Sequence, residues 1–377
     1  MMKLKIFILA GEASGDLHAS RLMRAIKVLN PDTQFIGIGG MNMEKEGLES
    51  LVSIEQMSVV GFWEVAKRYY FFKKTLEECK RTLVSSDVDA FIPVDYPGFN
   101  LKLGQFAKKS SIPVYYYIAP QLWAWGKGRA KKLSTQLDKL FVVFPFEVEF
   151  FNNFGIDAHF VGHPLLENKE YSFKIPTFDQ RENIIAYLPG SRKQELAKHL
   201  PIIRSLARAI KIKLPDYRHI IAQSPVLSES FYSEILQDPM FELSDSPRQL
   251  MLKAKAGVVK TGTSTLEAAF LGLPFVMFYK TSPITYFLGK KLINLDSISL
   301  VNILAKKKVI TEYIQNEISP KAISEEIADL VSNKERIGQL QTEFFNLKQM
   351  LGNSPASENA AKIIIESIEK NEFKKRT

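Results

Sequence analysis

The stretch KLKIFILAGEASGD (residues 3–16) decides the fold prediction, because it joins an apolar run to a glycine turn and the start of a helix. The run from Lys3 to Ala10 predicts a buried strand, and a helix is expected from about Asp16 to Val28. A buried strand, a glycine turn and a helix in this order are typical of a parallel α/β domain.

The same alternation of strands and helices continues along the chain, is interrupted once and then starts again. Further strands are predicted at 33–40, 90–95, 113–119, 139–144, 157–162, 183–188, 219–223, 256–259 and 274–279. We therefore expect an α/β protein with two tandem doubly wound, Rossmann-like domains facing a cleft. The expected parts are a domain at 1–166, a linker at 167–182, a domain at 183–350, and a helix at 351–377 that packs back on the first domain or on a partner subunit.

Length and composition agree with a globular protein of this kind. The 377 residues suit two domains of about 150 residues each, and 46% hydrophobic against 24% charged residues excludes wholesale disorder. The single cysteine, Cys79, excludes an intramolecular disulfide and a cysteine-rich zinc site. No apolar run is long enough to span a membrane and no cleavable leader is visible, so we expect a cytoplasmic protein. The net charge of +9 favours anionic partners.

The first strand-to-helix turn is a candidate binding element. Its two glycines free the backbone to approach a ligand, and we expect Glu12, Ser14, Gly15 and Asp16 to line the cleft. The alternative is a structural turn in which Ser14 or Asp16 caps the helix. The turn is not a P-loop, because the Gly-Lys-Ser/Thr ending is missing.

Asp95 is the candidate general base. It ends the apolar run at 91–94, and Pro97 and Gly98 stop the strand just beyond it. A carboxylate held at the end of a parallel strand points into the cleft, where it can take the proton of a substrate hydroxyl. The alternative, a helix cap, is less favoured because Asn100 is better placed to cap the next helix.

Two turns of the second half have the composition of anion sites. The first combines Gly190, Ser191 and Arg192 at a helix start, where an arginine suits a pyrophosphate. The second turn offers a glycine and three hydroxyls, from Gly262, Thr263, Ser264 and Thr265. One helical turn later, the Glu267 carboxylate can bind two ribose hydroxyls. Either turn alone could be an ordinary helix cap. Together with Asp95 they indicate a two-domain glycosyltransferase that uses a nucleotide-diphosphate sugar.

No metal site is predicted. The Asp87-Val88-Asp89 triplet spells the Asp-x-Asp of metal-dependent glycosyltransferases, but it precedes a strand instead of ending one, so a turn or cap is favoured. The five histidines (His18, His159, His163, His199 and His219) form no metal-like cluster in the sequence.

Over nearly its whole length the chain resembles the lipid-A-disaccharide synthases, glycosyltransferases with a GT-B type fold. The matching motifs lie at 10–16, 94–100, 118–125, 160–165, 188–192 with Glu195, and 261–267. The resemblance implies a metal-independent, inverting enzyme that needs no cofactor. Its substrates would be UDP-2,3-diacylglucosamine and 2,3-diacylglucosamine 1-phosphate (lipid X), and its products the β-1,6-linked disaccharide 1-phosphate and UDP. It also implies an enzyme on the anionic inner-membrane surface, with a homodimer as a possibility.

One segment departs from the family pattern. The family has Leu-Pro-Asn, then Ala-Gly-Arg, then a Glu and a Gln, whereas this chain has Leu300-Val301-Asn302 and Ala305-Lys306-Lys307. The polar residues persist, and we expect them to serve the site; they are Asn302, Glu312 and Gln315.

The stretch from Met57 to Arg81 predicts an amphipathic helix with an aromatic face and basic flanks. Such a helix suits an anionic membrane interface. The proposed membrane contacts are Trp63, Val65, Tyr69 and Phe72. The alternative is a domain helix that buries one face.

Two other functions stay open on the sequence alone. One is another UDP-sugar enzyme, an N-acetylglucosaminyltransferase or an epimerase. The other is a nucleotide- or RNA-binding protein explained by the net charge. Nucleic acid is not the expected partner, because the basic residues are scattered and Asp95 and Glu267 stand where phosphates would approach.

Overall fold

The computed structural model describes residues 3–57, 68–167, 175–224, 227–282, 286, 296–352 and 354–376. The chain divides into two compact units. Unit 1 is Met1–Glu167 together with Leu351–Thr377, and unit 2 is Asn168–Met350. Trp63 and Val65, two of the proposed membrane contacts, lie outside the described residues.

Unit 1 is built on a parallel sheet, which has seven strands among the residues described. In spatial order these are β3 (Leu48–Ser53), β2 (Gln34–Gly39), β1 (Lys5–Ala10), β4 (Ala90–Val94), β5 (Tyr115–Tyr117), β6 (Lys139–Val142) and β7 (Ala158–Phe160). The helices are α1 (Ala13–Leu29), α2 (Met41–Lys45), α3 (Ile54–Met57), α5 (Tyr69–Ser85), α6 (Pro97–Lys109), α7 (Leu122–Trp125), α8 (Lys127–Leu133), α9 (Pro145–Asn152) and α18 (Ala356–Arg376), with a 3-10 turn at Pro164–Glu167.

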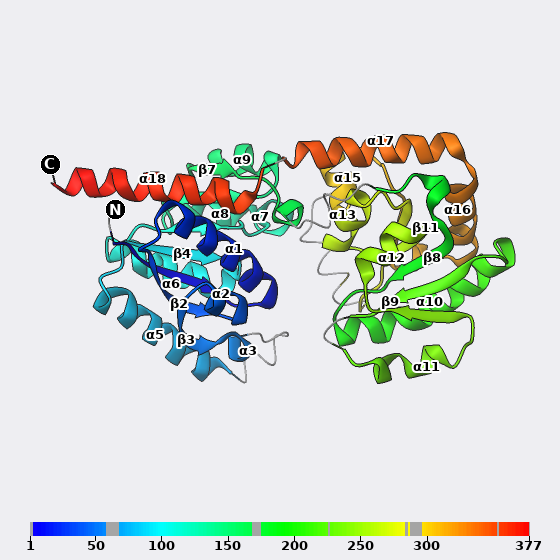
Figure 1. The fold of residues 1–377 in the computed structure, drawn as a ribbon, viewed down its shortest axis with the longest axis horizontal. Coiled ribbons are helices and arrows are strands. Elements are labelled where there is room, and N and C mark those ends of the chain that lie inside the picture. Colours follow the sequence, from blue (N-terminus) through cyan, green and yellow to red (C-terminus); the bar gives the residue numbers. More distant parts are fainter. Residues whose placement is uncertain are drawn as a thin grey trace. The chain divides into compact units, whose positions relative to one another are not determined.

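Helices cover both faces of this sheet, which explains the unbroken apolar run of β1. Successive side chains of a strand point to opposite faces. Ile6 and Ile8 belong to the core beneath α1 and α18, whereas Phe7 and Leu9 belong to the core beneath α5 and α6. The C-terminal helix α18, red in Figure 1, packs along α1 within unit 1.

Unit 2 repeats this plan with a parallel sheet of six described strands. Their spatial order is β10 (Phe241–Ser244), β9 (Arg218–Ala222), β8 (Glu182–Leu188), β11 (Ala254–Lys260), β12 (Phe275–Tyr279) and β13 (Glu312–Ile314). The helices are α10 (Lys193–Lys213), α11 (Ser233–Leu236), α12 (Pro247–Lys253), α13 (Thr263–Phe270), α15 (Leu300–Ala305), α16 (Pro320–Ser332) and α17 (Lys334–Met350), with 3-10 turns at Phe178–Gln180, Glu229–Tyr232 and Gln315–Glu317.

The strand order of each sheet reverses beside its first strand. β1 lies between β2 and β4, and β8 lies between β9 and β11. At such a reversal the two flanking connections leave the sheet in opposite directions and open a crevice at the strand carboxyl ends. The turns that follow β1 and β4 therefore share one crevice in unit 1, and those that follow β8 and β11 share one in unit 2.

The predicted parallel α/β class is confirmed, and the differences lie at the sheet edges. Three strands without a sequence prediction, β3, β10 and β13, carry polar residues, and the last two are also short, so their apolar patterns are weak. α1 begins at Ala13, three residues before the predicted start. Among the helices described, none is long and apolar enough to cross a membrane.

Arg181 anchors the start of unit 2. Its buried guanidinium donates to three carbonyl oxygens, those of Met251 at 2.7 Å, Ala254 at 3.0 Å and Leu271 at 2.6 Å. Burial lowers the pKa of Arg181 to about 10. The end of the stretch expected as a linker is thus tied to β11 and to the end of α13.

Candidate active site

The turns after β1 and β4 meet at Tyr96. A Cβ atom at Gly11 would lie 2.5 Å from the Tyr96 ring, so only glycine leaves room for this ring. Asp95 and Tyr96 both adopt left-handed backbone conformations, with φ of 47° and 51°. Such residues persist only where the surrounding structure holds them, and each costs on the order of 1–3 kcal/mol.

Hydrogen bonds fix this turn from several sides. The Asp95 N–H donates to the Tyr117 carbonyl at 3.0 Å, and the Asp95 carbonyl accepts from Tyr116 Oη and Asn100 Nδ2, both at 2.6 Å. The prediction that Asn100 caps the next helix is wrong. The N-cap of α6 is Tyr96, and the buried Asn100 amide instead serves carbonyls at the end of β4. The main chain of Asp95 is therefore held rigidly.

Burial is the main cause that raises the pKa of the Asp95 carboxyl to about 6. The negative charge of Glu12 raises it further, while the backbone N–H of Tyr96 lowers it. A carboxyl whose pKa lies closer to neutral pH is still partly ionised, and its carboxylate binds a proton more strongly than an ordinary carboxylate does. Both properties suit a general base.

Asp95 opens on a cavity of about 460 Å³. Aromatic and aliphatic side chains of α5 and α6 make most of its wall, and Glu12 reaches it from the start of α1. The structure thus brings together four of the residues singled out in the sequence, which are Glu12, Asp95, Tyr69 and Phe72.

The other residues of the first turn have different environments. Asp16 is buried and accepts four hydrogen bonds, from the N–H groups of Gly40, Asn42 and Met43 and from Asn42 Nδ2, at 2.8 to 3.2 Å. The alternative interpretation, in which Ser14 or Asp16 caps the first helix, does not hold, since the N-cap of α1 is Glu12 and no side chain caps it. Asp16 caps α2 instead. Ser14 is exposed, and Gly15 is buried against Ala10.

In unit 2 the turn after β8 has an open basic side chain. Gly190 has a φ of 106°, and Arg192 is the N-cap of α10 with a side chain that is 61% exposed. Ser191 is exposed as well. Arg192 Nη1 lies 3.5 Å from Glu195 Oε1, a weak contact that leaves the guanidinium accessible to an anion.

The turn after β11 presents fewer open hydroxyls than the sequence suggests. Gly262, with a φ of 132°, is the N-cap of α13. Thr263 is exposed and Ser264 half-buried, but Thr265 is buried and its hydroxyl donates to the Gly262 carbonyl at 2.7 Å. Glu267 lies 3.7 Å from the Arg248 guanidinium.

Sequence reasoning missed Lys260, which joins these turns, and His199, which joins the first of them to the segment after β12. Lys260, the last residue of β11, has its ammonium 3.1 Å from Glu195 Oε1, so it links the two turns. His199 is buried, with Nδ1 2.7 Å from the Pro189 carbonyl and Nε2 3.0 Å from the Lys280 carbonyl. The sequence offers only one signal for either residue, which is that it lies near a glycine turn along the chain.

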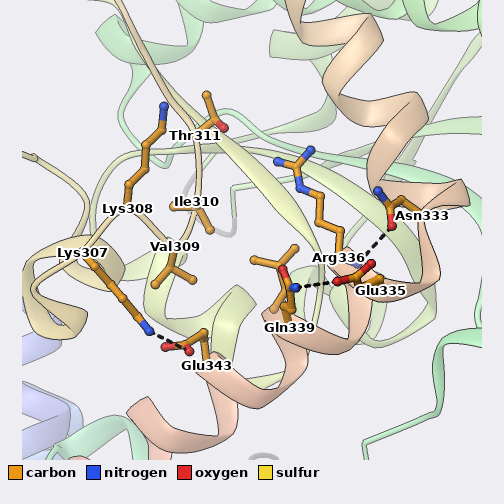
Figure 2. A pocket seen from close by; sticks show the side chains of 11 residues that line it. Lys307, Lys308, Val309, Ile310, Thr311, Asn333, Glu335, Arg336, Gln339 and Glu343 are labelled. Carbon is orange, nitrogen blue, oxygen red and sulfur yellow. Dashed lines mark hydrogen bonds and ion pairs between the residues drawn. The ribbon is translucent and has the colours of Figure 1, made fainter.

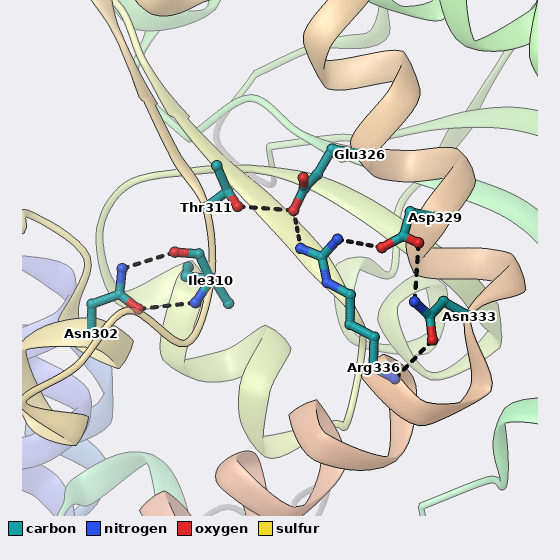
Figure 3. Close-up of polar contacts among 7 residues, drawn as sticks. All are labelled: Asn302, Ile310, Thr311, Glu326, Asp329, Asn333 and Arg336. Atoms are coloured by element: carbon teal, nitrogen blue, oxygen red, sulfur yellow. Dashed lines mark hydrogen bonds and ion pairs between the residues drawn. The ribbon is translucent and has the colours of Figure 1, made fainter.

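The atypical segment of unit 2 is internally braced. The Asn302 amide donates to the Ile310 carbonyl at 2.9 Å and accepts from the N–H of Ile310 at 3.0 Å (Figure 3). It also donates to Glu312 Oε1 at 2.8 Å. Glu312 also accepts from two N–H groups before α15, and Gln315 donates to a carbonyl at 3.4 Å. Lys306 has a φ of 53°, a left-handed conformation that glycine would adopt with less strain.

A larger cavity of about 700 Å³ lies in unit 2, between residues 307–311 and the start of α17 (Figure 2). Several of its charged groups are already paired. Lys307 pairs with Glu343 at 2.8 Å, and Arg336 pairs with Glu326 and Asp329 (Figure 3). None of the residues of the two glycine turns lines this cavity, so we assign it no part in the site.

Within the described residues, no group of three or more His, Cys, Asp or Glu side chains could hold a metal ion. Asp89 of the Asp-x-Asp triplet accepts the N–H of Lys5 at 2.7 Å, and Asp87 is a turn residue with a φ of 49°.

The structure describes only part of the predicted amphipathic helix at 57–81, because residues 58–67 lie outside the described residues. Met57 ends α3, and α5 begins at Tyr69. Tyr69 and Tyr70 are 67% and 78% exposed, whereas Phe72 is half-buried. The first turn of α5 therefore presents aromatic side chains to solvent.

Comparison with known proteins identifies the family. A family model described as lipid-A-disaccharide synthetase matches residues 6–364. The lipid-A-disaccharide synthases of Trichlorobacter lovleyi and Geobacter sulfurreducens are 36% and 35% identical over 376 and 375 residues, covering 97% of this chain and 98% of each relative. The chain belongs to the lipid-A-disaccharide synthase family.

It is accordingly a glycosyltransferase of lipid A biosynthesis, with lipid-A-disaccharide synthase activity. The resemblance drawn from the motifs is confirmed, and the full-length match leaves no support for the two alternative functions.

Solved structures show the fold class. The calicheamicin glycosyltransferase CalG4 has a TM-score of 0.62 at 12% identity and covers 98% of each chain. A putative UDP-N-acetylglucosamine 2-epimerase from Listeria monocytogenes has a TM-score of 0.64 at 12% identity, covering 99% of this chain and 98% of that one. The two parallel sheets thus form a GT-B-like fold, as expected for the lipid-A-disaccharide synthase family.

Replacing Asp16 with alanine should destabilise unit 1 without removing a reacting group. The change leaves three N–H groups at the start of α2 without their acceptor, which should cost about 3 kcal/mol. Urea unfolding followed by circular dichroism measures the shift. Glu12→Ala is the control, because the exposed Glu12 caps nothing with its side chain. A D16A protein as stable as the wild type would contradict the structural role.

Proposed function

We propose that the enzyme transfers 2,3-diacylglucosamine from UDP-2,3-diacylglucosamine to the 6-hydroxyl of 2,3-diacylglucosamine 1-phosphate (lipid X), with inversion. The products are the β-1,6-linked disaccharide 1-phosphate and UDP. The observation that carries this proposal is Asp95, whose carboxyl stands on a rigidly held turn, has a pKa of about 6 and lies beside a mostly apolar cavity. A base next to apolar walls suits the hydroxyl of an acylated sugar.

The reaction is a single displacement. Asp95 takes the proton of the acceptor 6-hydroxyl. At the same time the hydroxyl oxygen attacks the anomeric carbon of the donor sugar from the face opposite UDP. The bond between that carbon and the diphosphate oxygen breaks, and its electron pair leaves with UDP. A base in this position contributes about 10² to 10⁴ to the rate.

The donor is bound by the two glycine turns of unit 2. Arg192 and the helix starts at Ser191 and Gly262–Ser264 neutralise the diphosphate, because N–H groups and a guanidinium stabilise phosphate oxygens. Lys260 adds a second cation between the turns, and Glu267 accepts the ribose hydroxyls. Asn302, Glu312 and Gln315 support the donor side by holding their loop in shape. These groups replace a divalent cation, so the transfer is independent of metal.

The enzyme works at the anionic cytoplasmic face of the inner membrane, where its acylated substrates reside. Tyr69 and Tyr70 are exposed at the start of α5, close to Arg68, Lys73 and Lys74 in the sequence. Exposed aromatic rings flanked by cations favour the lipid headgroup region.

The direct test incubates the purified protein with UDP-2,3-diacylglucosamine and lipid X in mild detergent with excess EDTA. Mass spectrometry should detect the disaccharide 1-phosphate, and UDP should form in equal amount. Turnover that appears only when a divalent metal is restored would refute the metal-independent mechanism. Intact substrates under both conditions would refute the assigned substrates.

Asp95→Asn should lower kcat by about 10² to 10⁴ while leaving UDP affinity unchanged. In the wild type, kcat/KM should fall as the pH drops through about 6, because the base must be ionised and its pKa is about 6. The variant should lack this acidic limb. A pH–rate profile together with calorimetric UDP binding measures both effects, and an unchanged acidic limb would place the base elsewhere.

Tyr69→Ser combined with Tyr70→Ser should lower the fraction of protein that sediments with vesicles containing phosphatidylglycerol. Phe345→Ser is the matched control, since Phe345 is 61% exposed on α17 of unit 2. Equal losses for the control and the tyrosine variant, or no loss for either, would argue against a membrane contact at α5.

A further inference from the structure

The cavity beside Asp95 contains two lysines that the mechanism does not use. Lys73 comes from α5 and Lys102 from α6, and both side chains line the cavity. We propose that this cavity is an acceptor subsite in which Lys73 and Lys102 bind the phosphomonoester of the acceptor and the apolar wall receives an acyl chain. The inference rests on the proposed function and assigns recognition of the acceptor's phosphate.

Helical spacing puts the apolar and basic groups on one wall. Tyr69, Phe72, Lys73 and Leu76 recur at intervals of three and four residues, so they share one face of α5. Phe72 and Leu76 are half-buried, whereas Lys73 is exposed. Pro97 and Phe99 at the start of α6 add further apolar surface. A ligand in this cavity would meet hydrocarbon and an ammonium group side by side.

Both ammonium groups are available to a ligand. Among the described residues neither Lys73 nor Lys102 forms a hydrogen bond or ion pair. Two other lysines of the same helices are engaged, since Lys80 pairs with Glu77 at 2.7 Å and Lys108 with Asp138 at 2.5 Å. Two compact cations beside one cavity match the charge of a phosphate, which lysine binds as a point charge.

Glu12 and Asp95 line the same cavity, so an anion close to them would be repelled. The chemistry of the acceptor resolves this conflict. Its reacting 6-hydroxyl is on C6, a substituent of C5, whereas its phosphate is on C1 across the ring oxygen, so the intervening bonds hold the two groups apart. Lys102 lies five residues into α6 from Pro97, about 7.5 Å along the helix axis. The hydroxyl can therefore meet Asp95 while the phosphate lies farther along the cavity, next to the lysines.

The test compares lipid X with its dephosphorylated analogue, 2,3-diacylglucosamine, as acceptors in neutral detergent micelles at saturating donor. The wild type should prefer lipid X. The Lys73→Ala/Lys102→Ala variant should lose about tenfold of that preference in kcat/KM, the amount expected for a charge-assisted hydrogen bond. Its KM for the donor and its UDP affinity should be unchanged.

Lys74→Ala is the matched control. Lys74 is the next residue of α5 and is exposed, but it does not line the cavity. An equal loss in the Lys74 variant would show a general effect of surface charge and would overturn the subsite. A double variant that keeps the full preference for lipid X would also overturn it. A wild type that makes no disaccharide with either acceptor would instead refute the proposed function, so the two failures are distinguishable.

Discussion

The site depends on the reversal of strand order beside the first strand of each sheet. In unit 1 the chain leaves β1 toward one side and β4 toward the other, so the turns that carry Gly11 and Asp95 lie next to each other without a helix between them. In unit 2 the same reversal brings together the turns after β8 and β11, which Lys260 and Glu195 then join at 3.1 Å. Parallel pairing enforces both arrangements, because it puts all strand carboxyl ends at one edge.

The packing around Asp95 holds a strained backbone and also raises the pKa of the carboxyl. Two consecutive left-handed residues are unfavourable, and the side-chain hydrogen bonds from Asn100 and Tyr116 to the Asp95 carbonyl help to hold them. The same enclosure removes water from the carboxyl and raises its pKa to about 6. Gly11 makes the arrangement possible by leaving space for the Tyr96 ring. A larger residue at position 11 would therefore disturb both the turn and the proposed base.

The sequence was sufficient to predict elements whose pattern is local. The apolar run of β1, the glycine turn after it and the position of Asp95 at a strand end are all short-range features. Roles set by tertiary partners were not predictable. Asp16 looked like a cap for its own helix but binds the start of α2, and Asn100 looked like a cap but supports β4. Lys260 showed no motif, because its role comes from a strand paired across the sheet with β8.

A raised pKa is not enough to identify the base, as Glu147 shows. This carboxyl is buried, and burial raises its pKa to about 7 although Trp123 and two backbone N–H groups donate to it. Its contacts with Trp123, Val143 and Phe144 tie α7 to α9, and it does not line the acceptor cavity. Asp95 differs because it combines a raised pKa with access to that cavity. Access decides between them, since a base must come within hydrogen-bonding distance of the proton it removes.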